Sequence, residues 1–297
     1  MFPMPTETVD PRFVDIERWP TVAAVEAMLD GQLAALASLK TQTATIAAAA
    51  EAAAARLRLD GRLVYVGAGT SGRLAVQDGV ELGPTYNWPA DRLVFLLAGG
   101  TAAMTRSVEG AEDRVDMART EVLAADVGTN DVMIVVAASG RTPYAVAALA
   151  AAREAGALTI AIANNPGTPL LLGAEFAIAA DTGSEIVAGS TRMNAGTAQK
   201  AALNMLSTAI MLRSGLVHRG LMVNMRISNE KLRQRARRMV ATLADTDEVR
   251  AAEALEQANN DLRQAVLIAH GVSPEEAADR LADAGGDLGI ALAAGPA

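Results

Sequence analysis

Between residues 60 and 180 the chain alternates short apolar runs with longer helical stretches. The runs are apolar at every position rather than at every second one, which predicts strands buried on both faces of a sheet. Helical stretches such as 102–125 and 143–155 separate most of them, and this repetition predicts a parallel sheet with right-handed crossovers. We therefore predict an α/β fold, an αβα sandwich with a five-stranded parallel sheet. The five runs are 63–66, 93–97, 132–137, 158–163 and 176–179.

Outside this region the periodicity is helical. Residues 21–58 carry apolar positions near the 3.6-residue spacing, and long helices are predicted from about 194 to 213 and from 228 to 243. The last segment breaks into short amphipathic pieces, which predicts a small all-helical C-terminal domain. We predict three parts: an N-terminal arm with helices (1–58), the α/β domain (59–243) and the helical domain (244–297).

The composition excludes several classes of function. Lys and Arg number 26 against 34 Asp and Glu, a formal net charge of −8, which disfavours nucleic acid as a partner. Cysteine is absent, and His218 and His270 have no metal-ligand spacing, so we expect no metal and no cofactor. No apolar run free of polar groups reaches the ~18 residues of a membrane span, and the N-terminus lacks a signal-peptide pattern. We expect a cytoplasmic protein with no membrane contact.

In a parallel α/β sheet, ligands bind where the strands end. The first run ends in Gly67-Ala68-Gly69-Thr70-Ser71-Gly72, which matches the glycine spacing of a dinucleotide fingerprint. The acidic residue that such a fingerprint needs after the next strand is missing. Backbone N–H groups with the Thr70 and Ser71 hydroxyls would instead suit a single phosphate. A helix cap with no ligand explains this one motif equally well.

Two further loops carry the same residue types. Ser139, Gly140, Arg141 and Thr142 follow the third run, and Ser190 with Thr191 opens the long helix after the fifth. One such loop would be a helix cap. Three at strand ends of one sheet favour a phosphate or sugar-phosphate site.

Carboxylates are the natural acid–base candidates in a chain with this composition. Glu109, Glu112, Asp113 and Asp116 have the spacing of one helix face, which we expect beside the phosphate loop. Glu81 ends the helix that begins at that loop. A solvated acidic face is the alternative explanation.

Six ordered blocks of sequence, together covering about 60–235, resemble a known family. They are VGAGTSGRLAVQDGVELGPTY, LLAGG, SVEGAED, AASGRTPY, GSTRMNAGTAQKAALNMLSTA and GLMVNMRISNEKL. In combination they resemble the N-acetylmuramic acid 6-phosphate etherases, bacterial enzymes of peptidoglycan recycling that contain a sugar-isomerase (SIS) domain. The resemblance implies that the chain cleaves the D-lactyl ether of N-acetylmuramic acid 6-phosphate, giving N-acetylglucosamine 6-phosphate and D-lactate.

The resemblance also implies roles for individual residues. It makes Glu81 the acid that protonates lactate and Glu112 the base at C2 of the sugar. Lys200 and Glu185 are further candidates, each also explicable as a structural ion pair. It places the sugar phosphate against Gly69, Thr70, Ser71, Ser139, Gly140, Arg141 and Thr142, with Ser190 and Thr191 nearby.

Three segments depart from the family pattern. The usual opening is half present as Thr6-Glu7-Thr8-Val9-Asp10, Asn194 replaces a lysine, and Leu82-Gly83-Pro84 replaces Cys-Pro-Pro. If the replaced lysine lies near the lactyl carboxylate, Asn194 weakens binding there.

Two other functions remain open from the sequence. One is a non-catalytic sugar-phosphate sensor of the kind represented by glucokinase regulatory protein, and the other is a SIS-type isomerase. The retained pair Glu81 and Glu112 favours the etherase. We also predict a homodimer, because the family is dimeric and the apolar helices at 46–55 and from 194 carry more apolar surface than one small sheet covers.

Overall fold

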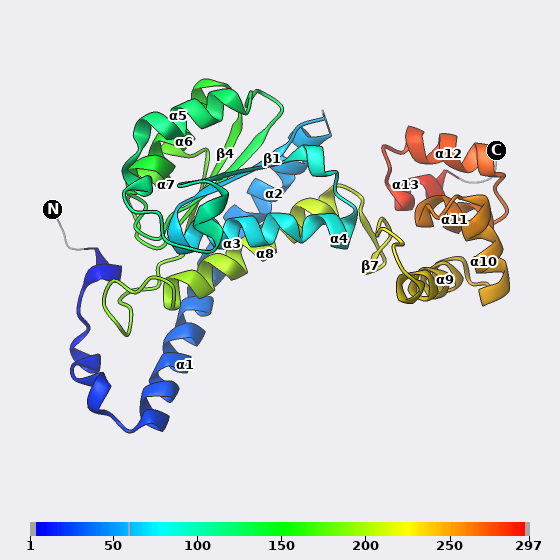
Figure 1. Ribbon diagram of the computed structural model, residues 1–297. Coiled ribbons are helices and arrows are strands. Elements are labelled where there is room, and N and C mark those ends of the chain that lie inside the picture. Colours follow the sequence, from blue (N-terminus) through cyan, green and yellow to red (C-terminus); the bar gives the residue numbers. More distant parts are fainter. Residues whose placement is uncertain (1–3, 59, 295–297) are drawn as a thin grey trace. The chain divides into compact units, whose positions relative to one another are not determined.

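The computed structural model describes residues 4–58 and 60–294. Residues 1–3 of the predicted N-terminal part, residue 59 and residues 295–297 of the predicted helical domain lie outside the described residues. Its contacts divide the chain into two compact units (Figure 1). The α/β unit comprises the described residues up to 80 together with 90–210, and the helical unit comprises 81–89 with the described residues from 211. Residues 211–243 thus make their contacts within the helical unit, whereas the sequence grouped them with the α/β segment.

The α/β unit is built on the predicted five-stranded parallel sheet. Its strand order is β2-β1-β3-β4-β5, so β1 and β3 are neighbours at the centre. Every residue of β1, β3 and β4 is buried, as expected for continuous apolar runs covered on both faces. The strands are β1 (Leu63–Gly67), β2 (Leu93–Leu97), β3 (Val132–Val136), β4 (Leu158–Ala163) and β5 (Phe176–Ala179), which confirms all five predicted runs.

Helices cover both faces of this sheet. Helices α2 (Thr43–Leu57) and α3 (Gly69–Val80) pack on one face, while α5 (Val115–Ala124), α6 (Pro143–Glu154) and α7 (Pro169–Gly173) pack on the other. The long helix α8 (Asn194–Arg213) has the bounds that the sequence predicted. The predicted αβα sandwich is therefore confirmed.

The N-terminal helical stretch consists of α1 (Thr21–Ser38), a short 3₁₀ turn η4 (Leu39–Gln42) and α2. By length and composition, Thr21–Leu57 also meets the criterion for a membrane-spanning helix, which the sequence argument did not expect. Apolar helices in protein cores meet the same criterion. Packing accounts for the α2 half, because it buries one whole face under the sheet: Ile46, Ala49, Ala50, Ala53, Ala54 and Leu57.

Helix α1 is different, because it extends away from the sheet (Figure 1). Only Ala35 of its residues is fully buried. The prediction that 46–55 and the helix from Asn194 carry the uncovered apolar surface is thus wrong for 46–55, whose apolar face is covered within the chain. Uncovered apolar side chains lie on α1, and α8 also leaves Met205 and Leu212 exposed.

A second correction concerns the predicted helix 102–125. The segment forms two 3₁₀ turns, η6 (Thr101–Met104) and η7 (Ala111–Asp113), and only then α5. Gly110 has a φ of 68°, a left-handed conformation that ends any helix there. Glu109, Glu112, Asp113 and Asp116 therefore do not form one helix face.

The N-terminal arm forms three 3₁₀ turns, η1 (Pro5–Glu7), η2 (Pro11–Phe13) and η3 (Ile16–Arg18). Two side chains fix it to the rest of the α/β unit. Thr6 is fully buried and bonds the side chain of Asn165 after β4, and Asp10 accepts a 2.7 Å hydrogen bond from Ser184 Oγ.

The helical unit contains α4 (Leu82–Tyr86) and a short antiparallel hairpin. The hairpin consists of two strands of two residues each, β6 (Val217–His218) and β7 (Leu221–Met222). Five helices follow, in agreement with the predicted helical C-terminal region. Asn229, Asp247, Asp261, Ser273 and Asp287 each cap the N-terminus of one of them with a side-chain oxygen. The helices are α9 (Glu230–Ala244), α10 (Glu248–Gln257), α11 (Leu262–Ala269), α12 (Pro274–Asp283) and α13 (Leu288–Ala293).

Candidate functional site

A cavity of about 420 Å³ lies in the α/β unit where β1 and β3 end. It collects loops that are far apart in the sequence, as expected at the carboxyl edge of a parallel sheet. It brings together eight of the predicted site residues. Its lining is Met4, Glu7, Ala68, Gly69, Thr70, Ser71, Glu112, Asp113, Ala138, Ser139, Arg141, Thr142, Pro143 and Thr191.

The first wall is the N-terminus of α3. Gly69 takes a φ of 53° and turns the chain from β1 directly into the helix. The first backbone N–H groups of a helix have no partner within it and attract anions. In the part of the chain that the structure describes, the hydroxyls of Thr70 and Ser71 form no hydrogen bond, so both are available to a ligand.

The second wall is the turn from β3 into α6. Ser139 Oγ accepts a hydrogen bond from the Arg141 backbone N–H at 3.1 Å and lies 3.4 Å from Thr142 Oγ1. Gly140 is required at this turn, because its φ is 61° and a Cβ there would lie 2.1 Å from Thr168 Oγ1. The turn presents two hydroxyls and one exposed guanidinium, a set suited to a phosphate.

Glu112 enters the cavity from the loop between β2 and α5. This loop is held by Arg73, whose Nε donates to the carbonyl of Ala103 at 2.8 Å and whose terminal nitrogen donates to that of Arg106 at 3.2 Å. Arg73 belongs to α3, so the loop that carries Glu112 is tied to the helix that carries Thr70 and Ser71. The Glu112 carboxylate is exposed and faces the same cavity as these hydroxyls.

Sequence reasoning missed two contributors from the arm, Met4 and Glu7. Asp113, which the sequence named among the carboxylate candidates without a role of its own, also lines the cavity. The half-preserved family opening at Thr6-Glu7 was the signal that could have identified Glu7. Nothing in composition or periodicity relates a residue this early in the chain to the strand ends.

Several predicted residues do not line the cavity. Gly140 and Ser190 are absent from its lining, although both stand next to residues that are present. Asn194 is buried and bonds the Ser184 carbonyl, so the departure from the family lysine lies outside the cavity wall. Lys200 is exposed and bonds Asn204.

Glu185 has a structural task. It is 1% exposed, and its two carboxylate oxygens accept the backbone N–H groups of Asn194 and Ala195 at 2.8 and 2.9 Å. Burial raises the pKa of Glu185, and these two bonds oppose that rise. It caps α8 and does not line the cavity.

Glu81 follows the last residue of α3 and is exposed. The 12 residues of α3 rise about 18 Å from Gly69 to Val80, so the two ends of the helix are widely separated. Asp78 anchors the far end: it is buried and accepts bonds from Tyr65 (3.0 Å), Asn204 (2.6 Å) and Ser207 (3.2 Å). Burial raises the pKa of Asp78, and the three hydrogen bonds oppose this.

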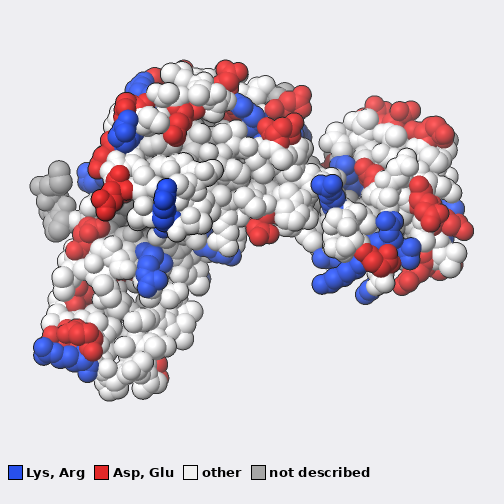
Figure 2. All heavy atoms as spheres, in the orientation of Figure 1, with Lys and Arg blue, Asp and Glu red and all other residues white. Residues whose placement is uncertain are grey.

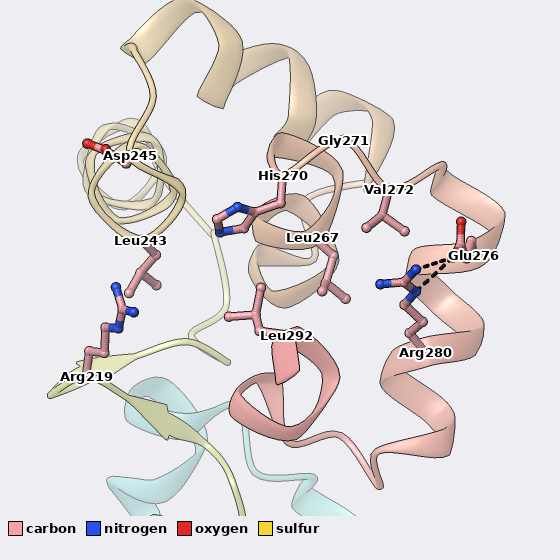
Figure 3. Close-up of a pocket in the computed structure, with 10 residues that line it drawn as sticks. All are labelled: Arg219, Leu243, Asp245, Leu267, His270, Gly271, Val272, Glu276, Arg280 and Leu292. Carbon is pink, nitrogen blue, oxygen red and sulfur yellow. Dashed lines mark hydrogen bonds and ion pairs between the residues drawn. The ribbon is translucent and has the colours of Figure 1, made fainter. Parts of the chain in front are cut away.

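A second cavity, of about 570 Å³, belongs to the helical unit (Figure 3). Its walls are apolar side chains with a charged rim, and Figure 3 shows Arg280 paired with Glu276 across one turn of α12. Neither a serine nor a threonine lines it, so it lacks the phosphate-binding residue types of the first cavity. Its lining is Arg219, Leu243, Asp245, Leu267, His270, Gly271, Val272, Glu276, Arg280 and Leu292.

A five-stranded parallel sheet whose first and third strands end in hydroxyl-rich turns defines the SIS-domain class. In agreement, residues 104–209 match the model of the SIS domain, and residues 45–153 match that of the glucokinase regulatory protein N-terminal SIS domain.

Full-length relatives specify the family. The chain is 47% identical over 298 aligned residues to an N-acetylmuramic acid 6-phosphate etherase of Deinococcus radiodurans, covering 99% of this chain and 97% of that protein. It is 43% identical to proteins of the same name from Erwinia tasmaniensis (97% and 94% covered) and Streptomyces coelicolor (97% and 93%). The chain belongs to the N-acetylmuramic acid 6-phosphate etherase family, as its motifs predicted.

Proposed function

We propose that this chain cleaves the D-lactyl ether of N-acetylmuramic acid 6-phosphate and that the 420 Å³ cavity is where it does so. The observation that carries this proposal is the meeting of two phosphate-type turns with the Glu112 carboxylate in one cavity. The phosphate binds Thr70 and Ser71 on one wall and Ser139, Arg141 and Thr142 on the other. The products are N-acetylglucosamine 6-phosphate and D-lactate.

The reaction needs one base and one acid. In the ring-opened sugar, the C2 proton is acidic because C2 lies next to the C1 aldehyde, and the lactyl oxygen on C3 is in the position of a β leaving group. The base removes the C2 proton, the C3–O bond breaks, and the acid protonates the departing lactate oxygen. Water then adds to C3 of the unsaturated aldehyde while C2 regains a proton. Two carboxyl groups in opposite protonation states can perform these steps.

We assign Glu112 as the base and Glu81 as the acid. The position of Glu112 in the cavity lining, beside the hydroxyls proposed to bind the phosphate, supports its assignment as the base. Glu81 is assigned from the family pattern. Because α3 separates it by about 18 Å from the helix end that binds the phosphate, we propose that the Glu81 of each site comes from a second copy of the chain.

A homodimer is supported by an uncovered apolar stripe on α1. Val22, Val25, Leu29, Leu33 and Leu36 recur at helical spacing and are 67, 55, 58, 55 and 40% exposed. The face of α1 that Figure 2 shows carries few charged side chains. An apolar stripe of this kind marks a protein–protein contact, and we propose that a second copy covers it.

The deciding experiment measures D-lactate released from N-acetylmuramic acid 6-phosphate by the purified chain. Wild type should release it, and Glu81→Gln and Glu112→Gln should each reduce the rate by at least about 100-fold, the lower range for a lost acid or base. Glu109→Gln is the matched control, because Glu109 is an exposed carboxylate on the same loop that does not line this cavity.

Two results would contradict the assignment. If wild type binds the sugar phosphate without releasing lactate, the chain is a sensor, the function suggested by the match to glucokinase regulatory protein. If Glu81→Gln releases lactate at the wild-type rate, the acid is another residue.

We place the enzyme in the cytoplasm and in peptidoglycan recycling. A sugar phosphate carries charge that prevents it from crossing a bilayer unaided, so the enzyme must share the compartment in which its substrate is phosphorylated. Fractionation of cells that express the chain, with lactate release as the assay, tests the location.

A further inference from the structure

The cavity has an unexplained carboxylate from the N-terminal arm. Glu7 lines it together with Glu112 and Asp113, whereas Arg141 is the only cation that the described residues contribute to the lining. In the part of the chain that the structure describes, Glu7 has no hydrogen bond or ion pair through its side chain. A phosphorylated sugar acid is itself negatively charged, so each carboxylate in the cavity opposes its binding. The third carboxylate, Glu7, therefore needs an explanation.

The arm is built to hold this residue in place. Immediately before it, the buried Thr6 accepts a 3.1 Å bond from Asn165 Nδ2, and its carbonyl accepts the Gly189 N–H at 2.9 Å. Asn165 also donates to the Ala138 carbonyl at 2.8 Å, which joins the arm to the turn after β3. Three residues after Glu7, Asp10 is fixed by Ser184.

Glu7 is thus fixed on both sides by neighbours that are themselves bonded, while its own carboxylate stays free. A Cβ added to Gly189 would lie 3.0 Å from Glu7 Oε2, so the carboxylate sits against the loop that also brings Thr191 to the cavity. A carboxylate accepts hydrogen bonds and donates none when ionised, so its partners on a sugar phosphate are hydroxyl and amide N–H groups.

We propose that Glu7 is a substrate-binding residue whose carboxylate accepts a hydrogen bond from a hydroxyl or amide N–H of the bound sugar. The arm, fixed at Thr6 and Asp10, positions it. Glu7 thereby distinguishes a sugar phosphate from inorganic phosphate. This inference rests on the proposed location of the site, and it does not depend on which glutamates perform the chemistry.

The test compares dissociation constants for N-acetylglucosamine 6-phosphate and for inorganic phosphate by calorimetry on the full chain. Glu7→Ala should weaken sugar-phosphate binding about 10- to 100-fold, the range for a hydrogen bond to a charged group, and should change phosphate binding less than about two-fold. Glu7→Gln should lose less, because its amide oxygen still accepts a bond. Glu17→Gln, an exposed carboxylate of the same arm, should behave as wild type.

A purely structural role would give a different pattern. Tryptic cleavage of the arm at Arg12 or Arg18 should be unchanged in Glu7→Ala and faster in Asp10→Ala, which loses an anchor. The proposal would be overturned if Glu7→Ala bound both ligands equally more weakly and was cleaved faster. It would also be overturned if sugar-phosphate binding did not change, or if the only change was tighter binding of phosphate. Lactate release by wild type tests the proposed function separately, and wild-type protein that binds no sugar phosphate would overturn both.

Discussion

Gly67 and Gly72 stand against one another across the turn from β1 to α3, so closely that a Cβ on Gly67 would lie 2.7 Å from Gly72 Cα. A Cβ on Gly72 would lie 2.3 Å from Leu97 Cδ1 and 2.8 Å from the Gly67 carbonyl carbon. The two glycines let the helix start close to the strand end, which brings Thr70 and Ser71 to the cavity.

Gly72→Ala should therefore destabilise the chain by about 1–3 kcal/mol, the range for overpacking, and raise the KM for the sugar phosphate. Leu97 can rotate away, but the Gly67 backbone cannot. Urea denaturation and substrate kinetics measure both effects. Gly128→Ala is the control, since a Cβ there meets nothing within 4 Å; equal behaviour of the two variants would contradict the close-approach argument.

Ser71→Ala should raise KM about 10-fold while leaving kcat nearly unchanged. The Ser71 hydroxyl faces the cavity, and a bond to a phosphate that does not react is present equally in the ground and transition states. Ser228→Ala, at an exposed serine of the helical unit, should have no effect. A fall in kcat alone would place Ser71 near the reacting carbons rather than the phosphate.

At the opposite edge of the sheet, Asp131 joins the starts of β1 and β3. It accepts bonds from the Arg62 backbone N–H (2.8 Å), from the Arg62 guanidinium (2.7 Å) and from the Gly128 N–H (3.0 Å). Burial alone would raise the pKa of Asp131, but these bonds outweigh it and the pKa is lowered.

A lowered pKa means that the ionised carboxylate stabilises the fold above the unfolded-state pKa of about 3.9, and that this stabilisation is lost as the pH falls through the folded-state value. Asp131→Asn should cost about 2 kcal/mol at pH 7 and progressively less below about pH 4. Urea denaturation across pH 3–7 measures this, with the exposed Asp91→Asn as the control. If the difference in free energy of unfolding between wild type and Asp131→Asn did not shrink at low pH, ionised Asp131 would not be the source of this stability.

The proposed dimer predicts that charges placed on the apolar stripe of α1 halve the mass in solution. Wild type should scatter light as twice 30.7 kDa, and Leu29→Glu with Leu33→Glu should give the single-chain mass, because charges in an apolar contact are costly. Leu123→Glu, at a leucine on α5 that is even more exposed than Leu29 and Leu33, should leave the mass unchanged. A monomeric wild type would remove both the dimer and the assignment of Glu81 to a second copy.

If each site takes Glu81 from one copy and Glu112 from the other, two inactive variants should complement each other. A mixed dimer of Glu81→Ala and Glu112→Ala contains one intact site and one with neither glutamate. After full exchange at equal amounts, about a quarter of the wild-type lactate release should return. Should the mixture stay inactive while exchange is demonstrated, both glutamates belong to one chain.

The sheet was predictable because its strands are covered on both faces and so leave continuous apolar runs. The strand-end turns were predictable for a related reason, since Gly69, Ser71 and Ser139 follow those runs directly. The broken segment 101–113 was not, because its charge spacing fits a helix and only the left-handed φ of Gly110 shows otherwise.

Contacts between distant segments had no local signal. The bond from Asn165 to Thr6 joins positions 159 residues apart, and periodicity contains no information on such pairs. For the same reason, the sequence indicated apolar helices that need covering without showing that α2 is covered within the chain and α1 is not.

The fixed arm has a practical consequence for handling the protein. Met4 lines the cavity, so a peptide fused a few residues ahead of Met4 joins the chain close to the proposed ligand site. An affinity tag at that end would compete with substrate for space or bury itself in the entrance, and kinetic constants measured with it would describe the fusion. Purification through the other end of the chain, or removal of the tag before any assay, avoids this error.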